Sequence, residues 1–321
     1  MTLRVKLGPG GKDQLPLGMG GSFYGLDHRH HQGETDLWAA LETALDCGIT
    51  HFDTATDYAD GASERLLGRF LAGVPGRRDR VFLASKANPD ALSAQAVTQA
   101  VEASLKRLRT DVIDLYYLHW PRSGEDLRPW MEGLERARGQ GMIRAAGVSN
   151  FSVAQMEQVA EVGRIDACQL GYNLLWRFPE RNVLPYCVGR GIAVVAYSAL
   201  AHGILSGRYG RTLDFAPGDQ RWTISLFGSE VWPHVHHTVE AFRQVAEHHG
   251  RPLPTLALRW LLGRPAVTSV LVSAKNAGQA RANALSLAVD VPEGLLDELT
   301  ALSDRALDFV PDEGNPFGHH P

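Results

Sequence analysis

Residues 48–73 read GITHFDTATDYADGASERLLGRFLAG, and this stretch holds one full repeat of the pattern that decides the fold. The short apolar run at residues 49–52 predicts a buried strand, which gives way to a polar loop. Residues 63–71 then predict a helix, and the Ser-Glu pair at its start is suited to cap it. The stretch is therefore a strand followed by a loop and a helix.

The same unit recurs along the chain on both sides of this stretch. Short apolar runs predict strands at residues 16–21, 49–52, 81–85, 113–118, 144–148, 167–170, 192–197 and 269–272. Amphipathic stretches predict helices at residues 34–47, 63–71, 93–108, 127–138, 153–162, 181–190, 233–249, 254–262, 277–287 and 293–302. Because parallel strands need a connection of helix length, this alternation predicts a parallel sheet. Eight such units close naturally into an α/β fold of the (β/α)8 TIM-barrel type.

The ends of the chain add to this barrel. A Gly-Pro-Gly-Gly turn between residues 3–7 and 14–17 predicts an N-terminal β-hairpin, and extra C-terminal helices follow the eighth strand. The alternative is a doubly wound open sheet, but no G-x-G-x-x-G follows the first strand, as the dinucleotide fingerprint of such sheets would require. No linker divides the chain, so we expect one domain over residues 1–321, with a loose tail at 312–321.

Two stretches lack a helical or strand pattern. Residues 201–232 predict a long irregular segment, and we expect substrate specificity to reside there and in the tail after Asp304, neither of which carries a readable motif. Residues 77–80, Arg-Arg-Asp-Arg, predict a solvated turn.

Composition excludes several functional classes. The 321 residues are 44% hydrophobic and 21% charged, with a formal net charge of −4, so no basic face for nucleic acid is expected. No run of about 18 apolar residues is present, and no secretory leader is expected, so we predict no membrane span. The three cysteines, Cys47, Cys168 and Cys187, are odd in number and widely spaced, which favours a reduced, cytoplasmic protein without a disulfide framework or zinc site.

Polar and ionisable side chains follow the predicted strands, where a barrel carries its chemistry. Burying such groups costs free energy unless they have a function or a hydrogen-bond or charge partner. The residues at these positions are Asp53, Tyr58, Lys86, His119, Trp120, Ser149, Asn150, Gln169, Tyr197 and Ser198. Because they stand at the same end of their strands, we expect them to form one site.

Four of these residues predict a proton-donor assembly. Tyrosine is a weak acid with a pKa of about 10, and a nearby ammonium such as that of Lys86 would lower the pKa of Tyr58. A buried lysine needs a counter-charge, which Asp53 can supply. His119 is suited to orient a carbonyl or to relay a proton to Tyr58. Reduction of a carbonyl needs such an acid, because hydride addition creates an alkoxide.

Five sequence blocks resemble the aldo-keto reductase superfamily. They are residues 48–58 with Gly61 and Ser63-Glu64, then Ser85-Lys86, residues 118–121, residues 147–151 and residues 169–173. The blocks occur in order at barrel-compatible spacing, and the resemblance extends to about Asn283. It implies a barrel that binds an extended NAD(P)H across its mouth and reduces an aldehyde or ketone.

The resemblance also implies the roles of individual residues. The catalytic tetrad would be Asp53, Tyr58, Lys86 and His119. The cofactor would be bound by Ser22, Phe23, Asp53, Ser149, Asn150, Gln169, Tyr197, Ser198, Leu200, Gly203, Arg208, Ser273, Lys275, Gln279 and Asn283. Within this set Ser149, Asn150 and Gln169 would hold the carboxamide, and Tyr197 would stack on the nicotinamide. Tyr24 and Trp120 would line the substrate pocket, although core or rim packing is an equal alternative for such aromatics.

The last cofactor block sets the expected preference between NADPH and NADH. Gln279 and Asn283 are four residues apart, so they face the same side of a helix, as a grip on adenosine requires. Lys275 near the start of that helix can meet a 2′-phosphate, which predicts NADPH. The block departs from the family pattern, since Val272-Ser273 replaces Pro-Gly and Ala282 replaces a frequent Glu. NADH therefore remains an alternative.

Two rival functions and one rival site remain open. The intact tetrad is also compatible with a cofactor-binding redox sensor that resembles the β subunits of potassium channels, or with a cofactor-binding protein of negligible turnover. His28, His30 and His31 could suggest a metal cluster, but no matching carboxylate or cysteine pattern accompanies them, so we expect a solvated loop and no metal site. The expected partner is a small-molecule carbonyl substrate, and the sequence predicts no oligomeric state.

Overall fold

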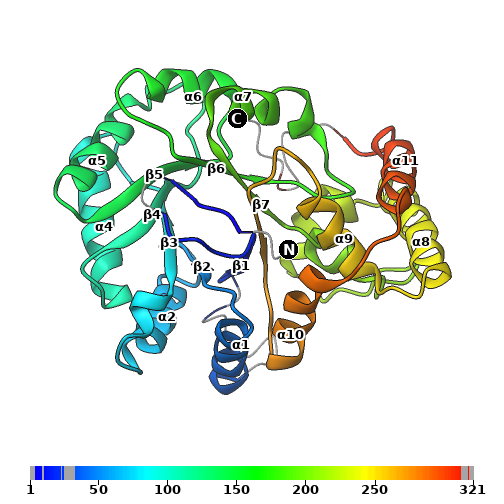
Figure 1. The fold of residues 1–321 in the computed structure, drawn as a ribbon. Coiled ribbons are helices and arrows are strands. Elements are labelled where there is room, and N and C mark those ends of the chain that lie inside the picture. Colours follow the sequence, from blue (N-terminus) through cyan, green and yellow to red (C-terminus); the bar gives the residue numbers. More distant parts are fainter. Residues whose placement is uncertain (1–3, 9–10, 23, 25–32, 312–316, 318–321) are drawn as a thin grey trace.

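Eight parallel strands form a closed barrel in chain order, and β1 pairs with β8 to complete the ring (Figure 1). The structure is a computed structural model, and it describes residues 4–8, 11–22, 24, 33–311 and 317. The strands are β1 (Leu17–Gly20), β2 (His51–Asp53), β3 (Phe82–Ala87), β4 (Ile113–Leu118), β5 (Ile143–Ser149), β6 (Ala167–Gly171), β7 (Ala193–Tyr197) and β8 (Ser269–Val272). The predicted (β/α)8 architecture is confirmed, and the doubly wound open sheet is excluded.

Helices surround the barrel on its outer side (Figure 1). Those that connect or follow the strands are α1 (Glu34–Asp46), α2 (Ala62–Ala72), α3 (Arg77–Arg80), α4 (Ala94–Leu108), α5 (Arg128–Gly139), α6 (Val153–Ala160), α7 (Val183–Arg190), α8 (Trp232–His248), α9 (Leu253–Leu262), α10 (Ala277–Leu285) and α11 (Leu295–Leu307). The predicted extra helix after the eighth unit is α11, which packs against α8 at the edge of the barrel (Figure 1).

The helix boundaries follow local chemistry. The Ser93 hydroxyl accepts a hydrogen bond from the Ala96 amide at the start of α4, and Ser152 and Gln155 form a capping box at the start of α6. Such caps satisfy amide groups that the first turn leaves without partners. Gly68 lets α2 approach the end of α4, because a Cβ at Gly68 would lie 2.3 Å from the Arg107 carbonyl oxygen.

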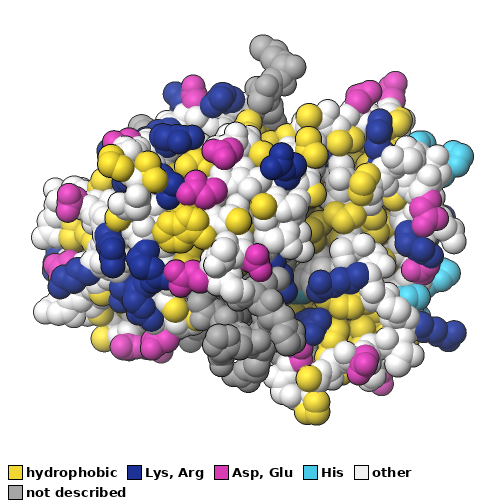
Figure 2. All heavy atoms as spheres, turned by 90° about the horizontal axis from the view of Figure 1, so that it is seen from below, with side chains coloured by type: hydrophobic (Ala, Val, Ile, Leu, Met, Phe, Trp, Pro, Cys, Tyr) yellow, Lys and Arg dark blue, Asp and Glu magenta, His cyan; other side chains and the backbone are white. Residues whose placement is uncertain are grey.

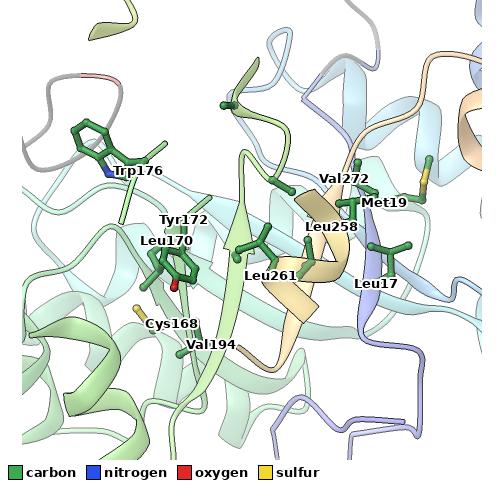
Figure 3. Close-up of a cluster of buried hydrophobic side chains, with 14 of the residues drawn as sticks. Leu17, Met19, Cys168, Leu170, Tyr172, Trp176, Val194, Leu258, Leu261 and Val272 are labelled. Carbon is green, nitrogen blue, oxygen red and sulfur yellow. The ribbon is translucent and has the colours of Figure 1, made fainter. Parts of the chain in front are cut away.

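Two apolar cores hold the fold together. One fills the barrel interior and includes Phe82, Leu115, Tyr117, Val195 and Leu271. The other lies between the strands and the helices, where outward-pointing side chains of the strands meet the buried faces of the helices. Figure 3 shows part of it, with Leu17 and Met19 of β1, Val272 of β8, and Leu258 and Leu261 of α9. The barrel is therefore a packed core rather than a pore.

The N-terminal segment closes the amino end of the barrel. Where the structure describes the predicted hairpin, it has one antiparallel bridge, in which the Val5 amide donates to the Gln14 carbonyl at 2.9 Å and the Gln14 amide donates to the Val5 carbonyl at 3.0 Å. Leu7 packs into the barrel interior, and a Cβ at Gly8 would meet Ala145, near the start of β5. Because this end is covered, the opening of the barrel lies at the carboxyl ends of the strands.

The segment between β7 and α8 contains only short 3-10 turns, as the irregular pattern of residues 201–232 predicts. These turns are η3 (Ala201–Ser206), η4 (Gln220–Thr223) and η5 (Ser225–Phe227), and two more, η2 (Phe178–Arg181) and η6 (Ser286–Ala288), lie elsewhere.

The prediction of a solvated turn at residues 77–80 is wrong for its first residue. Arg77 begins the short helix α3 and is only 6% exposed, because its guanidinium donates to Phe70 at 2.7 Å and pairs with Glu42 at 2.5 Å.

The surface mixes charges of both signs. On the face seen in Figure 2, Lys and Arg side chains are interspersed with Asp and Glu side chains. Within the described part of the chain, no helix is both long and apolar enough to cross a membrane. The same residues contain no group of three or more His, Cys, Asp or Glu side chains that could hold a metal ion. His28, His30 and His31 lie outside the described residues.

Candidate active site

A buried ion pair stands at the centre of the open end of the barrel. Asp53 is the last residue of β2, and Lys86 lies in the neighbouring strand β3. The Lys86 ammonium pairs with Asp53 Oδ1 and donates to the Thr54 carbonyl at 2.8 Å. Gln169 Nε2 donates to Asp53 Oδ2 at 2.9 Å. Lys86 is 0% exposed and Asp53 2%, so each charge depends on the other for compensation.

Tyr58 and His119 lie beside this pair. The Lys86 Nζ is 5.1 Å from the centre of the Tyr58 ring, and the rings of Tyr58 and His119 meet edge to face at 5.7 Å. Tyr58 belongs to the loop after β2, and His119 directly follows β4. The four residues of the predicted tetrad are therefore brought together from three consecutive strand ends.

The expected lowering of the pKa of Tyr58 is not found. Burial raises the pKa of Tyr58 well above its usual value, and the carboxylates of Asp53 and Asp57 raise it further. The Lys86 ammonium does not offset this effect, since it is already paired with Asp53. Tyr58 consequently keeps its proton at neutral pH, which is the state that a proton donor needs.

His119 is neutral in the same environment. Burial lowers the pKa of His119 and the Lys86 ammonium lowers it too, whereas the Asp57 and Asp53 carboxylates oppose this shift. Its Nδ1 atom lies 3.3 Å from Asp57 Oδ1.

A second group of predicted residues forms a hydrogen-bonded row at the ends of β5 to β7. The Tyr197 hydroxyl donates to Asn150 Oδ1 at 2.7 Å, and Asn150 Nδ2 contacts Ser149 Oγ at 3.0 Å and the His119 carbonyl at 3.1 Å. Asn150 has a φ of +64°, a left-handed conformation that Asn tolerates better than most residues. Together with Gln169, these side chains place amide and hydroxyl groups directly beside the tetrad.

The loop after β7 turns sharply next to this row. Ser198 has a φ of +54°, and its hydroxyl lies 3.2 Å from His202 Nε2. Gly203 has a φ of +89°, and a Cβ there would lie 2.7 Å from the Arg208 guanidinium. Arg208 itself lies over the Tyr209 ring, with 4.6 Å from its Cζ to the ring centre. Leu200 immediately precedes η3 and is half-buried.

The residues after β8 form a compact cap on α10. Ser273 Oγ donates to the Gly20 carbonyl at 2.9 Å, and Asn283 Nδ2 donates to the Ser273 carbonyl at 3.3 Å. The Lys275 amide donates to Gln279 Oε1 at 2.9 Å, which fixes Gln279 over the first turn of the helix. Both predicted helix residues therefore face the loop that carries Lys275.

Three cations converge where the loops after β7 and β8 meet. Burial lowers the pKa of Lys275, and the positive charges of Arg208 and Arg221 lower it further. Arg221 is held by Asp219 at 2.6 Å and donates to the Tyr209 hydroxyl at 3.3 Å, and Arg208 contacts the same tyrosine. Sequence reasoning did not identify Arg221, because it lies in the irregular segment without a motif.

The other residues predicted to bind cofactor or substrate differ in their exposure and in their distance from the site. Ser22 is exposed just after β1, whereas Phe23 lies outside the described residues. Tyr24 is 1% exposed and belongs to the apolar core, and its hydroxyl has no hydrogen-bond partner among the described residues. Trp120 is half-buried, with its ring 5.5 Å from that of His119. Of the two predicted pocket aromatics, Trp120 stands at the edge of the site, whereas Tyr24 is fully buried and near enough to Asp53 that burial and the Asp53 carboxylate both raise its pKa.

Phe317, in the tail after Asp304, is a residue of the site that sequence reasoning did not name individually. Its ring lies 6.0 Å from that of Trp120, 6.4 Å from that of Tyr197 and 5.2 Å from that of His202. It belongs to a tail that carries no motif, and only its position in space connects it to the barrel mouth. Asp57, in contrast, stands within the quoted stretch, where a carboxylate next to Tyr58 was a readable signal.

The mouth of the barrel thus combines an acid, a buried ammonium and an imidazole with a row of amides and a cationic cluster. The sequence profile of the Aldo/keto reductase family matches residues 16–304, and the chain belongs to this family. It is an NAD(P)H-dependent oxidoreductase that acts on carbonyl groups.

Similar proteins span most of the chain. The aldo-keto reductase YhdN of Bacillus subtilis (strain 168) is 35% identical over 262 residues, which are 78% of this chain and 79% of that protein. The NADH-specific methylglyoxal reductase of Escherichia coli (strain K12) is 30% identical over 300 residues, 85% of this chain and 91% of the relative.

Solved structures agree with the fold over nearly the whole length. The glycerol dehydrogenase AKR11B4 from Gluconobacter oxydans superposes with a TM-score of 0.83 at 26% identity and covers 96% of each chain. An aldo-keto reductase from Klebsiella pneumoniae in complex with NADPH superposes with a TM-score of 0.75 at 27% identity and covers 98% of this chain and 99% of its own.

Proposed function

We propose that the protein reduces a small aldehyde or ketone with NADPH and that Tyr58 donates the proton. One observation supports this proposal above the others: a protonated Tyr58 stands between the Lys86–Asp53 ion pair and His119 at the open end of the barrel. A carbonyl oxygen placed between Tyr58 and His119 would meet a proton donor and an imidazole at once. Tyr58 would stabilise the negative charge that the oxygen acquires during reduction, and His119 would do so in the form that presents an N–H to that oxygen.

The residues fit a nicotinamide dinucleotide. The cluster of Arg208, Arg221 and Lys275 favours an anionic ligand, because each cation is stabilised by negative charge placed among them. The left-handed Gly203 leaves room beside Arg208 that a side chain would fill. When bound, the cofactor supplies the hydride that is transferred to the carbonyl carbon.

Each group of residues has a distinct task in this proposal. Lys86 and Asp53 form a buried ion pair next to the Tyr58 ring, and burial together with the carboxylates of Asp53 and Asp57 keeps Tyr58 protonated until it donates. His119 orients the carbonyl oxygen. Groups that would hold the cofactor are, from nicotinamide to adenosine, Ser149, Asn150, Gln169 and Tyr197, then Ser198, Leu200, Gly203 and Arg208, then Ser273, Lys275, Gln279 and Asn283.

Turnover of a carbonyl panel tests the reaction. The loss of NADPH absorbance is followed with methylglyoxal, glyceraldehyde and 4-nitrobenzaldehyde for the wild type, Tyr58→Phe and the control Tyr186→Phe. We expect Tyr58→Phe to lose on the order of 10²–10⁴-fold in kcat, as is usual for removal of a general acid. Its dissociation constant for NADPH should stay within about twofold, because the substitution leaves the cationic cluster and the amide row in place.

Two outcomes would contradict the proposal, and a third would invalidate the assay. A Tyr58→Phe variant as active as the wild type would remove Tyr58 from its role. A wild type that binds NADPH but turns over no carbonyl would overturn the reductase and favour the cofactor-binding redox sensor, which resembles potassium-channel β subunits. An equal loss in Tyr186→Phe would show that the assay reports general damage to the protein.

The choice between NADPH and NADH depends on Lys275. Among the similar proteins one is named as NADH-specific and another is in complex with NADPH, so the family accommodates both cofactors. A charge-assisted hydrogen bond contributes about 1.5–3 kcal/mol, so Lys275→Ala should raise the dissociation constant for NADPH by roughly 10- to 100-fold. The constant for NADH, which has no 2′-phosphate, should stay unchanged. The control Lys106→Ala alters an exposed lysine of α4 and should affect neither cofactor.

A further inference from the structure

We propose that Asp57 is a positioning residue for His119: it directs the imidazole with Nδ1 toward the carboxylate and Nε2 toward the substrate, and it thereby sets the pH range in which His119 gives up its proton. The proposal rests on the reductase function proposed above. It assigns a task to a side chain that lies outside the predicted tetrad and directly precedes Tyr58 in the chain.

A closed ring of contacts places Asp57 against His119. Asp57 Oδ1 lies 3.3 Å from His119 Nδ1, and Asp57 Oδ2 accepts a hydrogen bond from Asn88 Nδ2 at 3.1 Å. Asn88 Oδ1 in turn accepts from the amide of Trp120, the residue after His119, at 2.9 Å. The loops after β2, β3 and β4 are thus tied together. Asp57 Oδ2 accepts a hydrogen bond, whereas Asp57 Oδ1 is in ion-pair contact with His119 Nδ1, a buried nitrogen without a hydrogen-bond partner in the part of the chain that the structure describes.

The burial of the two partners differs in a way that suits this task. The His119 side chain is 6% exposed, whereas that of Asp57 is 44% exposed. The carboxylate therefore keeps contact with solvent and stays ionised at little cost, while it faces an imidazole that solvent hardly reaches. The contacts to His119 and the Lys86 ammonium lower the pKa of Asp57, against the effect of its partial burial, which is the largest single influence.

Three charged groups and burial act on the charge of His119. The Asp57 and Asp53 carboxylates favour the imidazolium, whereas burial and the Lys86 ammonium disfavour it. Tyr58 also faces the imidazole, edge to face, but it is uncharged at neutral pH. Asp53 is already neutralised by Lys86, so Asp57 is the carboxylate whose removal changes the balance at His119 most directly.

The chemistry follows from the two nitrogens of imidazole. A neutral imidazole carries one N–H, and a carboxylate at Nδ1 favours the form in which that N–H is on Nδ1. Nε2 then has a lone pair that can accept a proton from solvent. Once protonated, Nε2–H donates to the carbonyl oxygen, and the positive charge stays close to Asp57. Without Asp57 the neutral ring has no preference for this form, and the protonated ring loses its partner.

The expected effect is a shift along the pH axis. An opposite charge at this distance shifts a pKa by one unit or more, and the partial exposure of Asp57 favours the lower end, so we expect about one unit. Asp57→Asn should lower the pKa of His119 by about one unit. The protonated form then appears only at lower pH, and the corresponding step in log kcat/KM against pH should move to lower pH by the same amount.

Nuclear magnetic resonance tests the pair without relying on turnover. The histidine C2–H signals of the protein without cofactor are followed against pH, and the signal of His119 is identified by its loss in His119→Gln. Asp57→Asn is compared with the wild type and with Asp60→Asn, an exposed carboxylate three residues away that does not act on the charge of His119. We expect the lower pKa in Asp57→Asn alone.

The outcomes separate this proposal from the proposed function. An unchanged His119 pKa in Asp57→Asn, or an equal change in Asp60→Asn, overturns the pairing. A lowered pKa with an unmoved pH profile overturns the part of the proposal that concerns the reaction. A wild type without carbonyl turnover defeats the reductase function, but the titration still decides whether Asp57 governs His119. Asn88→Ala supplies an independent check, since it frees Asp57 Oδ2 and should shift the His119 pKa in the same direction by less.

Discussion

Replacing Asp53 with Asn removes the counter-charge of Lys86 while keeping the shape of the side chain. Lys86 is 0% exposed and would retain one acceptor, the Thr54 carbonyl at 2.8 Å. The amide oxygen of Asn could still accept from Gln169 Nε2, which now donates to Asp53 Oδ2 at 2.9 Å. The substitution therefore isolates the loss of charge compensation at one buried ammonium.

The magnitude follows from the burial of both partners. Breaking a buried ion pair by removing one partner costs about 3–5 kcal/mol of the free energy of unfolding, because the remaining charge is left buried without compensation. With a denaturant dependence of about 3 kcal/mol per molar urea, the midpoint should fall by roughly 1–2 M. The double variant Asp53→Asn/Lys86→Met removes both charges, and its midpoint should return to near that of the wild type.

Urea unfolding followed by fluorescence and circular dichroism measures both variants. Asp126→Asn is the control, because Asp126 belongs to an exposed ion pair with Arg128, and its midpoint should not change. A drop of less than about 0.3 M for Asp53→Asn, the equivalent of some 1 kcal/mol, would show that Lys86 finds compensation elsewhere. A double variant no more stable than the single one would show that the cost does not arise from the unpaired ammonium.

Three further predictions concern packing, pH and the mouth of the site. Gly68→Ala should destabilise the protein by about 1–3 kcal/mol, because its Cβ would lie 2.3 Å from a backbone oxygen of α4. Gly189→Ala, on the open face of α7, should instead stabilise the protein by up to about 1 kcal/mol. The midpoints of urea unfolding check both variants. Burial lowers the pKa of His51 from 6.5 to about 4, so the unfolded chain binds more protons than the folded chain between these pH values. The free energy of unfolding should therefore fall as the pH decreases from 6.5 to 4. His51→Gln should flatten this dependence, which unfolding midpoints at several pH values measure. Phe317→Ala should raise KM for 4-nitrobenzaldehyde by about 2- to 10-fold relative to methylglyoxal, because an aromatic substrate loses a ring that now packs beside Trp120; equal changes for both substrates would refute this.

The barrel was predictable because its signal is repeated. Each strand of the sequence pattern is short and apolar and each connection is of helix length, so errors of one or two residues at the boundaries do not alter the topology. The hairpin shows the limit of this reasoning. Among the described residues its arms form one bridge, between Val5 and Gln14, and Leu17 at the end of the second arm belongs to β1.

The assembly of the predicted tetrad and amide row was predictable for a related reason. Residues that follow parallel strands in a closed barrel meet at one end of the barrel, whatever the length and conformation of the loops between them. The direction of the pKa shift at Tyr58 was not predictable, because it depends on burial and on two carboxylates rather than on the presence of a lysine. Arg221 and Phe317 reach the site from segments without periodicity, and only the folded chain shows their neighbours.

The complete burial of Lys86 also determines how the protein will react with reagents from outside. Lys6, Lys12 and Lys106 are exposed and will be modified at once by an amine-reactive label, whereas the Lys86 amine is shielded by the barrel and held by Asp53 and Thr54. Its modification requires that the barrel mouth opens first, so the labelling rate of this one amine measures the frequency of that opening. The labelling rate of a single side chain at the centre of the site thus reports the rate of local unfolding.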